Sequence, residues 1–260
     1  MLRQLRNTLS FALTSGQSGI LLQKLFERFF DARGSLSPAA NRAWLAEQSQ
    51  PFAALAARLN ASLWAEAQAF AADLRQHAAS TLQALDVELG GGGDYAMLYF
   101  LTRHLRPEVV VETGVAAGYS SQAFLSALKA NGGGKLYSSD FPYFRIRNPE
   151  QYIGILVAEQ LRADWQLYIE GDQKNLKRIR AEVPRIDLFH YDSDKRYRGR
   201  QLALRMLAPQ LAADALLLFD DIQDNSFFHD LVHSAIYAAR PWHVFASGSK
   251  FIGCIGLKAA

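Results

Sequence analysis

Cysteine is nearly absent from this sequence: Cys254 is the one cysteine among 260 residues, and it lies in an apolar run. A single cysteine forms no disulfide within its own chain, and a cysteine zinc site needs several such ligands. The sequence therefore excludes a disulfide framework and a cysteine metal centre within one chain. We expect Cys254 to be a buried structural thiol.

Long uncharged hydrophobic runs are also absent, since none approaches the roughly 18 to 20 residues that span a bilayer. Basic and mildly apolar residues open the chain, but Ser15 and Gln17 interrupt them before the apolar core of a signal peptide develops. We therefore expect no membrane partner, no signal peptide and a cytoplasmic location.

A strong excess of charge of one sign is missing as well. The 28 basic residues exceed the 25 acidic ones by a net charge of +3, and they are spread along the chain rather than gathered in a block. This distribution does not favour nucleic-acid binding, and we expect a small-molecule substrate as the partner. Hydrophobic residues make up 50% of the chain, which is enough to bury the core of one α/β domain with a helical extension.

The first third of the chain has a helical pattern. A first helix holds Phe26 and Phe30, and apolar residues such as Leu55, Leu59 and Leu63 recur at helical spacing further on. A glycine run at 90–93 marks the end of this region. We predict that residues 1–92 are a helical N-terminal extension, which caps the site or pairs two subunits of a homo-oligomer, and that residues 93–260 form the main domain.

Short apolar runs and helical segments alternate after residue 107. The expected strands are 109–111, 135–139, 165–169, 186–191, 215–219, 242–246 and 251–257, and the expected helices between them are 120–130, 152–162, 175–183, 199–207 and 228–239. Strand-helix alternation predicts parallel strands joined by crossover helices. Four residues, 247–250, separate the last two strands, and they allow a hairpin but no crossover. The predicted fold is α/β: a Rossmann-like, doubly wound seven-stranded sheet with an antiparallel last strand, preceded by a helical region.

Candidate cofactor residues follow the first two strands of this sheet. In open α/β sheets the ligand lies beyond the carboxyl ends of the strands. Gly114 and Gly118, four residues apart, let the backbone turn tightly after the first strand, and Asp140 ends the second strand where an acidic residue reaches ribose hydroxyls. These features indicate an adenosine-containing cofactor. A nicotinamide site favours a glycine where Ala116 stands.

The pattern Glu-x-Gly-x-x-x-Gly from Glu112 to Gly118 resembles the first motif of class I methyltransferases, and the terminal hairpin resembles the same class. This resemblance implies S-adenosylmethionine as the cofactor, with contacts from Glu112, Gly114, Gly118, Ser120, Asp140, Asp172 and Asp192. Asp172 would contact the adenine ring. Its alternative role is the N-cap of the helix at 175–183.

Three acidic residues end the fourth and fifth strands. Asp192 follows the fourth strand and Asp220-Asp221 the fifth, so their carboxylates are expected to converge on one rim. Such crowding raises carboxyl pKa values, and a hard divalent cation relieves the repulsion. Mg²⁺ suits a site of oxygen ligands that keeps room for water. We therefore predict a magnesium site at Asp192, Asp220 and Asp221.

A closer resemblance appears at the same residues. Asp192-x-x-Lys195 and Asp220-Asp221 resemble the metal and base motifs of cation-dependent catechol and caffeoyl-CoA O-methyltransferases, whereas 109–257 more closely resembles the bacterial macrolide-sugar and rhamnosyl O-methyltransferases. The resemblance implies that Mg²⁺ holds a substrate hydroxyl and that Asp192 and Lys195 are catalytic, with Lys195 taking the proton. The sugar enzymes usually carry histidine in place of Lys195, and the catechol type carries Asp-Asn in place of Asp220-Asp221. The acceptor class therefore stays open among sugars, phenols and other natural products.

Several alternatives remain at this point. Lys195 can instead pair with Asp192 or Asp194 at the surface, and Asp220-Asp221 can cap the following segment. Without the metal, the chain would be a metal-independent N- or O-methyltransferase; further alternatives are a nicotinamide-dependent oxidoreductase and a non-catalytic binding protein. His229 and His233 share a helical face, and we favour a packed or solvated pair over a zinc site. We read His190, in a strand, as a core residue, and Arg145 and Arg147 as lid residues or ordinary surface residues.

Overall fold

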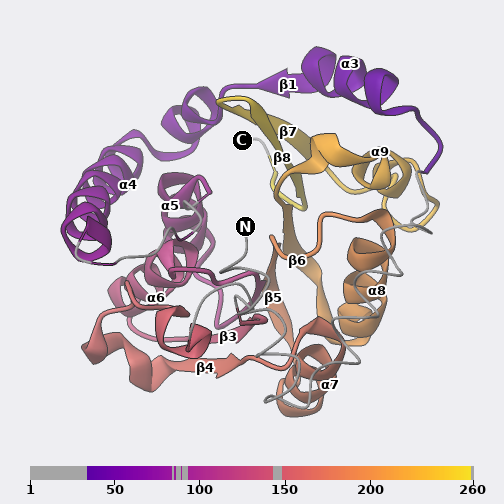
Figure 1. Ribbon diagram of the computed structural model, residues 1–260. Helices are drawn as coiled ribbons and strands as arrows, with labels where there is room; N and C mark the ends of the chain where they lie inside the picture. The colour runs from indigo at the N-terminus through magenta and orange to yellow at the C-terminus, as the bar shows by residue number, and fades with distance from the viewer. Residues whose placement is uncertain (1–33, 84, 86–88, 90–92, 143–147, 259–260) are drawn as a thin grey trace, which may run out of the picture.

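The computed structural model describes residues 34–83, 85, 89, 93–142 and 148–258. One mixed sheet runs through these residues, and helices cover both of its faces (Figure 1). The expected first helix with Phe26 and Phe30, and the loop arginines Arg145 and Arg147, lie outside the described residues.

The sheet has the strand order β1-β7-β8-β6-β5-β2-β3-β4. Its strands are β1 (Ser49–Gln50), β2 (Val109–Thr113), β3 (Lys135–Ser139), β4 (Trp165–Tyr168), β5 (Ile186–Tyr191), β6 (Leu211–Phe219), β7 (Trp242–Ser247) and β8 (Lys250–Ile255). Only β8 is antiparallel to its neighbours, β6 and β7, among the paired strands of the described chain. The predicted doubly wound sheet with its closing hairpin is confirmed.

The helices form a layer on each face. They are α3 (Pro38–Gln48), α4 (Phe52–Gln83), α5 (Tyr95–Leu105), α6 (Tyr119–Ala130), α7 (Asp172–Glu182), α8 (Tyr197–Leu207) and α9 (Phe227–Val232). Figure 1 shows α4, α5 and α6 on one side of the sheet and α7, α8 and α9 on the other. No helix of the described ranges combines the length and the apolar character that crossing a membrane requires.

Two buried clusters hold these layers to the sheet, because neighbouring residues of a strand point to opposite faces. Val110 and Leu218 belong to the cluster under α4, α5 and α6, while Val111 and Leu217 belong to the cluster under α7, α8 and α9. Cys254 is fully buried in the first cluster and unpaired, as predicted. Strands covered on both faces explain the nearly continuous apolar runs in the sequence.

The eighth strand comes from the N-terminal region. Ser49 and Gln50 form β1 and pair in parallel with Val244 and Phe245 at the edge of the sheet. The Gln50 amide and His243 Nδ1 lie 3.1 Å apart and tie the two strands further. A strand of two residues is too short to show an alternation of apolar and polar residues. The seven predicted strands therefore do not include β1.

The predicted helix at 152–162 is wrong. The segment instead holds two short 3₁₀ turns, η1 (Pro149–Tyr152) and η2 (Glu159–Asp164), with an irregular stretch between them. The N–H groups of Gly154 and Leu156 donate to the carbonyls of Ala116 and Ala117, both at 2.9 Å. These tertiary hydrogen bonds replace the helical ones. The expected helix at 228–239 is likewise shortened to α9, followed by turns.

Candidate active site

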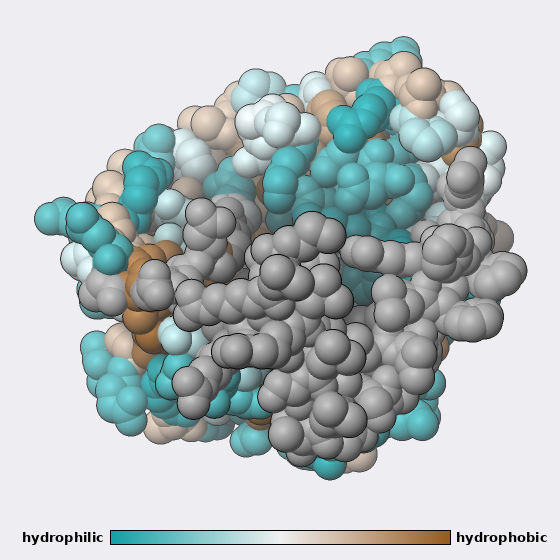
Figure 2. All heavy atoms as spheres, viewed as in Figure 1, coloured by the Kyte–Doolittle hydropathy of each residue, from teal (hydrophilic) through white to brown (hydrophobic). Residues whose placement is uncertain are grey.

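The predicted site residues lie at the carboxyl ends of β2 to β6 and at the starts of α6 and α7, which follow β2 and β4. The chain runs from β2 through β3 to β4, and returns to the other side of β2 with β5 and β6. The order of strands thus reverses between β2 and β5, which is where ligands bind in doubly wound sheets. Hydrophilic residues gather on the face seen in Figure 2, over the region of β7, β8 and α9 in Figure 1.

The loop between β2 and α6 has a backbone that favours glycine. Gly114 and Gly118 have φ angles of 84° and 98°. A Cβ at Gly114 would collide with the backbone carbonyl of Asp192, and one at Gly118 would lie 2.8 Å from Cα of Gly154. Both glycines are therefore required for close packing, and Gly114 places this loop directly beside the end of β5.

Ala116 stands in the middle of the loop with a φ of 51°. This left-handed conformation is disfavoured by roughly 1–2 kcal/mol for a residue with a Cβ. The surrounding hydrogen bonds compensate: its N–H donates to Asp140 Oδ2 at 2.8 Å, and its carbonyl accepts from Gly154. Ala116 is thus held in a conformation that glycine adopts freely.

Asp140, at the end of β3, closes the glycine loop. Its Oδ2 accepts N–H groups of Val115 at 3.1 Å and Ala116 at 2.8 Å, and its Oδ1 accepts the N–H of Phe141 at 2.6 Å. Burial raises the pKa of Asp140 to about 6, against these hydrogen bonds. Two carboxylate oxygens offer about four acceptor positions, so one remains for a ligand hydroxyl.

Glu112 lies fully buried beneath the same loop. Its carboxylate accepts the hydroxyls of Ser120 at 2.8 Å, of Ser138 at 2.7 Å, and of Ser121. Burial raises the pKa of Glu112 to about 7 in spite of these three donors. The predicted cofactor residues Glu112 and Ser120 therefore contact each other, and they anchor the start of α6 to β2 and β3.

Asp172 is the first residue of α7 and faces β3 and β5. Its carboxylate accepts the hydroxyls of Ser139, at 2.6 Å, and of Ser193. The N-cap of α7 is Gly171, so the alternative role of Asp172 as a cap does not hold.

The buried Asn175 completes this junction, and no sequence pattern indicated its role. Its amide donates to the carbonyls of Tyr168 and Asp140, at 2.9 and 3.0 Å.

The three predicted metal ligands do come together. Asp192, Asp220 and Asp221 each offer a carboxylate oxygen, and these atoms all lie within 4.8 Å of one another. Burial, and then the negative charges of Asp220 and Asp221, raise the pKa of Asp192 to about 8. Burial and Asp221 raise the pKa of Asp220 as well. In the part of the chain that the structure describes, no hydrogen bond reaches the Asp192 carboxylate.

Asp221 differs from its two neighbours because cations already surround it. Lys195 forms an ion pair with Asp221 Oδ2, and Lys250 Nζ lies 3.0 Å from Oδ1 and 3.2 Å from Oδ2. Gln223 donates to Oδ1 at 3.0 Å. Burial alone would raise the pKa of Asp221, but these hydrogen bonds hold it below its ordinary value. Lys195 thus forms an ion pair, but with the buried Asp221 of the acidic cluster rather than with Asp192 or Asp194 at the surface.

No sequence pattern predicted that Lys250 and Arg200 belong to this site. Lys250 begins β8, and the antiparallel pairing of Phe219 with Gly253 brings this start beside the residues that follow β6. Arg200, on α8, is 1% exposed and donates to the backbone carbonyls of Asp220 and Asp221, both at 2.9 Å. Asp221 has a φ of 51°, so Arg200 fixes a strained turn beneath the carboxylates.

The histidines lie away from these carboxylates. The ring centroids of His229 and His233 lie 4.4 Å apart with the rings tilted, and His229 packs edge-on against Trp44 at 4.9 Å, which fits a packed pair. His190 is 3% exposed, and burial lowers its pKa to about 4, so it is a core residue as expected.

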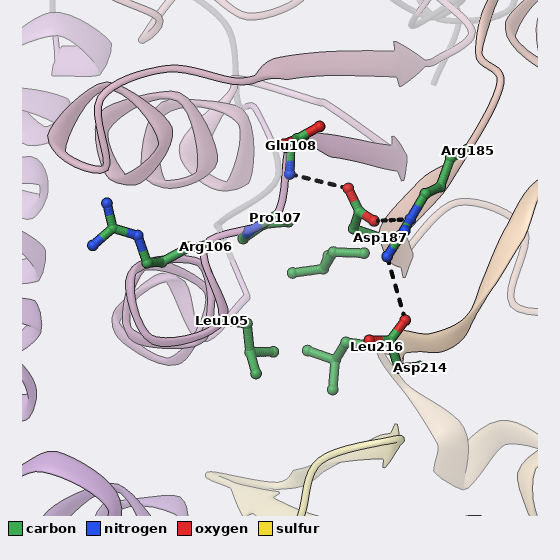
Figure 3. A pocket seen from close by; sticks show the side chains of 9 residues that line it. Leu105, Arg106, Pro107, Glu108, Arg185, Asp187, Asp214 and Leu216 are labelled. Atoms are coloured by element: carbon green, nitrogen blue, oxygen red, sulfur yellow. Dashed lines mark hydrogen bonds and ion pairs between the residues drawn. The ribbon is translucent and has the colours of Figure 1, made fainter.

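A cavity of about 270 Å³ lies near the amino ends of the strands, away from the acidic cluster, and is lined by the end of α5 and by residues of β5 and β6 (Figure 3). Leu188 and Leu216 line its apolar part. Arg185 is paired there with Asp187, at 2.6 Å, and with Asp214, at 3.4 Å. These charges satisfy each other, and the cavity holds none of the predicted site residues.

Comparison with known protein families indicates the class of enzyme. Residues 111–222, which run from β2 through the acidic cluster, match the family model of a methyltransferase domain. This part of the chain is therefore similar to methyltransferase domains. The match confirms the prediction of a methyltransferase, and no curated protein matches the chain.

Two solved structures share this fold at low sequence identity, and a third is reported beside them. A methyltransferase from Geobacter sulfurreducens is 19% identical, with 72% of this chain and 89% of that chain covered and a TM-score of 0.50. The O-methyltransferase TomG from Streptomyces achromogenes, involved in tomaymycin synthesis and solved with SAM, is 14% identical, with 70% and 88% covered and a TM-score of 0.50. An O-methyltransferase from Bacillus cereus, solved with SAH, is 16% identical, with 75% and 90% covered and a TM-score of 0.49.

Proposed function

We propose that this methyltransferase is an S-adenosylmethionine-dependent O-methyltransferase that uses Mg²⁺ and acts on a hydroxyl of a small molecule, such as a sugar, a phenol or another natural product. One observation carries the proposal: the glycine loop after β2 and the acidic cluster after β5 and β6 adjoin at the strand-order reversal. Gly114 packs against the backbone of Asp192, so a cofactor on the loop would lie next to the carboxylates.

The residues around the loop suit an adenosyl cofactor. Asp140, after β3, and Asp172, at the start of α7, approach each other where one ribose and one adenine contact would lie. Glu112 and Ser120 would act from beneath, by holding the loop in place, with Gly114 and Gly118 giving the close backbone approach. S-adenosylmethionine would supply an activated methyl group at this edge.

The acidic cluster suits a divalent cation. Asp192 and Asp220 are crowded carboxylates whose pKa values burial and mutual repulsion raise, and a hard cation favours their ionised forms. Bound at Asp192, Asp220 and Asp221, Mg²⁺ would supply a Lewis acid for the acceptor hydroxyl.

We propose that Lys195 receives the acceptor's proton in its neutral amine form, which a divalent cation bound at the cluster would favour by repelling the ammonium. Its side chain is 49% exposed at the mouth of the cluster while its ammonium contacts Asp221. In the transfer, the acceptor oxygen forms a bond to the methyl carbon as the carbon-sulfur bond breaks, and the hydroxyl proton leaves to a base. The rest of the catalysis lies in placing oxygen, carbon and sulfur in line.

TomG is an O-methyltransferase. As part of the proposal, we assign oxygen as the atom that this protein methylates. We also propose a cytoplasmic enzyme whose residues 1–92 cap the acceptor or pair two copies. In support, α3 approaches the segment after β6, since the Asn41 amide donates to the carbonyls of Ile222 and Asn225 at 3.1 and 3.0 Å.

Calorimetric titration with S-adenosylhomocysteine tests the cofactor, and methyl transfer to a panel of sugars and phenols tests the acceptor. We expect micromolar binding, and turnover that EDTA abolishes and Mg²⁺ restores. D220N should lose turnover but keep S-adenosylhomocysteine binding, while the exposed-lysine variant K177M should keep both. Absence of S-adenosylhomocysteine binding would refute the cofactor assignment.

A metal-independent methyltransferase is the second candidate. The specific observation in its favour is that Lys195 and Lys250 already neutralise Asp221. Turnover that is unchanged in EDTA and in D220N would select this candidate.

A further inference from the structure

Lys250 is the least expected member of the acidic cluster. It begins β8, reaches Asp221 from the hairpin side and makes contacts of 3.0 and 3.2 Å with the two carboxylate oxygens. Its side chain is 49% exposed, whereas the side chain of Asp221 is 2% exposed. A half-exposed ammonium therefore covers a buried carboxylate on the side from which solvent and ligands arrive.

The hairpin does not depend on this ion pair for its position. The backbones of β7 and β8 pair from Trp242 with Ile255 to Ser247 with Lys250. Gln223 also holds the hairpin, because its Oε1 accepts the N–H of Phe251 at 3.0 Å while its Nε2 reaches Asp221. The ammonium of Lys250 thus adds charge at a point where the polypeptide is already fixed.

The charges at the cluster set up a competition. Asp192, Asp220 and Asp221 carry three negative charges when ionised, and Lys195 and Lys250 supply two positive charges next to Asp221. A divalent cation and an ammonium both favour the Asp221 oxygens, and they repel each other. Each therefore weakens the binding of the other, and by linkage the effect is reciprocal.

We propose that Lys250 is a resident counter-cation, which competes with the divalent cation for Asp221 and thereby sets the affinity of the cluster for that cation. The inference rests on the metal part of the proposed function. Lys250 acts through Asp221 and is a positioning residue. When the divalent cation binds, the ammonium leaves the carboxylate and becomes accessible on the acceptor side.

Mn²⁺ binding provides the test, because the electron paramagnetic resonance signal of free Mn²⁺ falls on binding and requires no acceptor. We expect K250M to bind Mn²⁺ about tenfold more tightly than the wild type. Coulomb's law gives this effect for a unit charge roughly 6 Å from a divalent ion, even at the dielectric constant of water. K250R keeps the charge and should stay near the wild-type affinity, and K177M, on the exposed face of α7, should match the wild type.

An unchanged or weaker Mn²⁺ affinity in K250M would overturn the inference while leaving the metal site of the wild type in place. If neither the wild type nor K250M binds Mn²⁺ at millimolar concentration, both the inference and the metal part of the proposed function are wrong. Amine labelling of Lys250 in the wild type, read by mass spectrometry, gives a second measurement that needs no variant. Faster labelling with Mn²⁺ supports the displacement, and equal or slower labelling contradicts it.

Discussion

Glu112 offers a direct probe of the cofactor loop, because its carboxylate is fully buried under that loop and its pKa is raised to about 7 from an ordinary value of 4.5. A carboxyl group whose pKa is raised in the folded state favours folding in its protonated form. Its contribution is therefore complete below pH 4.5 and is lost as the pH rises through 7. Replacement by glutamine, which is neutral at every pH, removes this dependence.

The magnitude follows from the two pKa values. Between pH 5 and pH 8 the linkage relation gives a loss of roughly 2.5 kcal/mol in the free energy of unfolding from Glu112 alone. Other buried carboxyls such as Asp140 and Asp192 add slopes of the same sign, so the informative quantity is the difference between wild type and E112Q. We expect E112Q to gain about 2.5 kcal/mol relative to the wild type over this interval.

Urea denaturation followed by tryptophan fluorescence at pH 5, 6, 7 and 8 measures this difference. D187N is a control, because Asp187 pairs with Arg185 at the opposite edge of the sheet. A wild-type and E112Q pair with parallel pH profiles would show that Glu112 is ionised throughout, and the account of the buried serine-carboxylate anchor would be wrong.

Three further predictions concern the surroundings of the carboxylates. R200M should lower the free energy of unfolding by about 3–5 kcal/mol in denaturant titrations, because it removes two charged hydrogen bonds to buried carbonyls. The control R205M, on the exposed face of α8, should change the free energy of unfolding by less than about 0.5 kcal/mol. A116G should leave stability equal or raise it by up to about 1 kcal/mol in the same assay, since glycine relieves the left-handed φ; a clear loss would contradict the strain. G154A should lower the melting temperature by several degrees, because a Cβ there collides with the Trp165 ring. An unchanged melting temperature would mean that the segment over the glycine loop adapts.

Local patterns predicted much of the fold. Apolar runs bounded by turn residues gave the strands from β2 to β8, and the four residues at 247–250 were too few for anything but a hairpin. The acidic cluster was predictable for a related reason: Asp192 and Asp220-Asp221 directly follow strands, and parallel strands end at a common edge.

Contacts between distant segments could not be predicted in this way. The 152–162 segment has a helical composition, yet Gly154 and Leu156 form hydrogen bonds with the glycine loop instead. Lys250 and Arg200 reach Asp221 and its neighbour from a hairpin and a helix whose registers no local period specifies.

The central claim is that the loop from Gly114 to Gly118 binds an adenosyl cofactor and that Asp192, Asp220 and Asp221 bind a divalent ion beside it. A crystal structure of the protein grown with S-adenosylhomocysteine and Mn²⁺, with anomalous scattering recorded for manganese, tests this claim most directly. We expect a manganese peak within coordination distance of the three carboxylates and the cofactor sulfur on the neighbouring loop. A peak elsewhere, or S-adenosylhomocysteine bound away from Gly114, would contradict it.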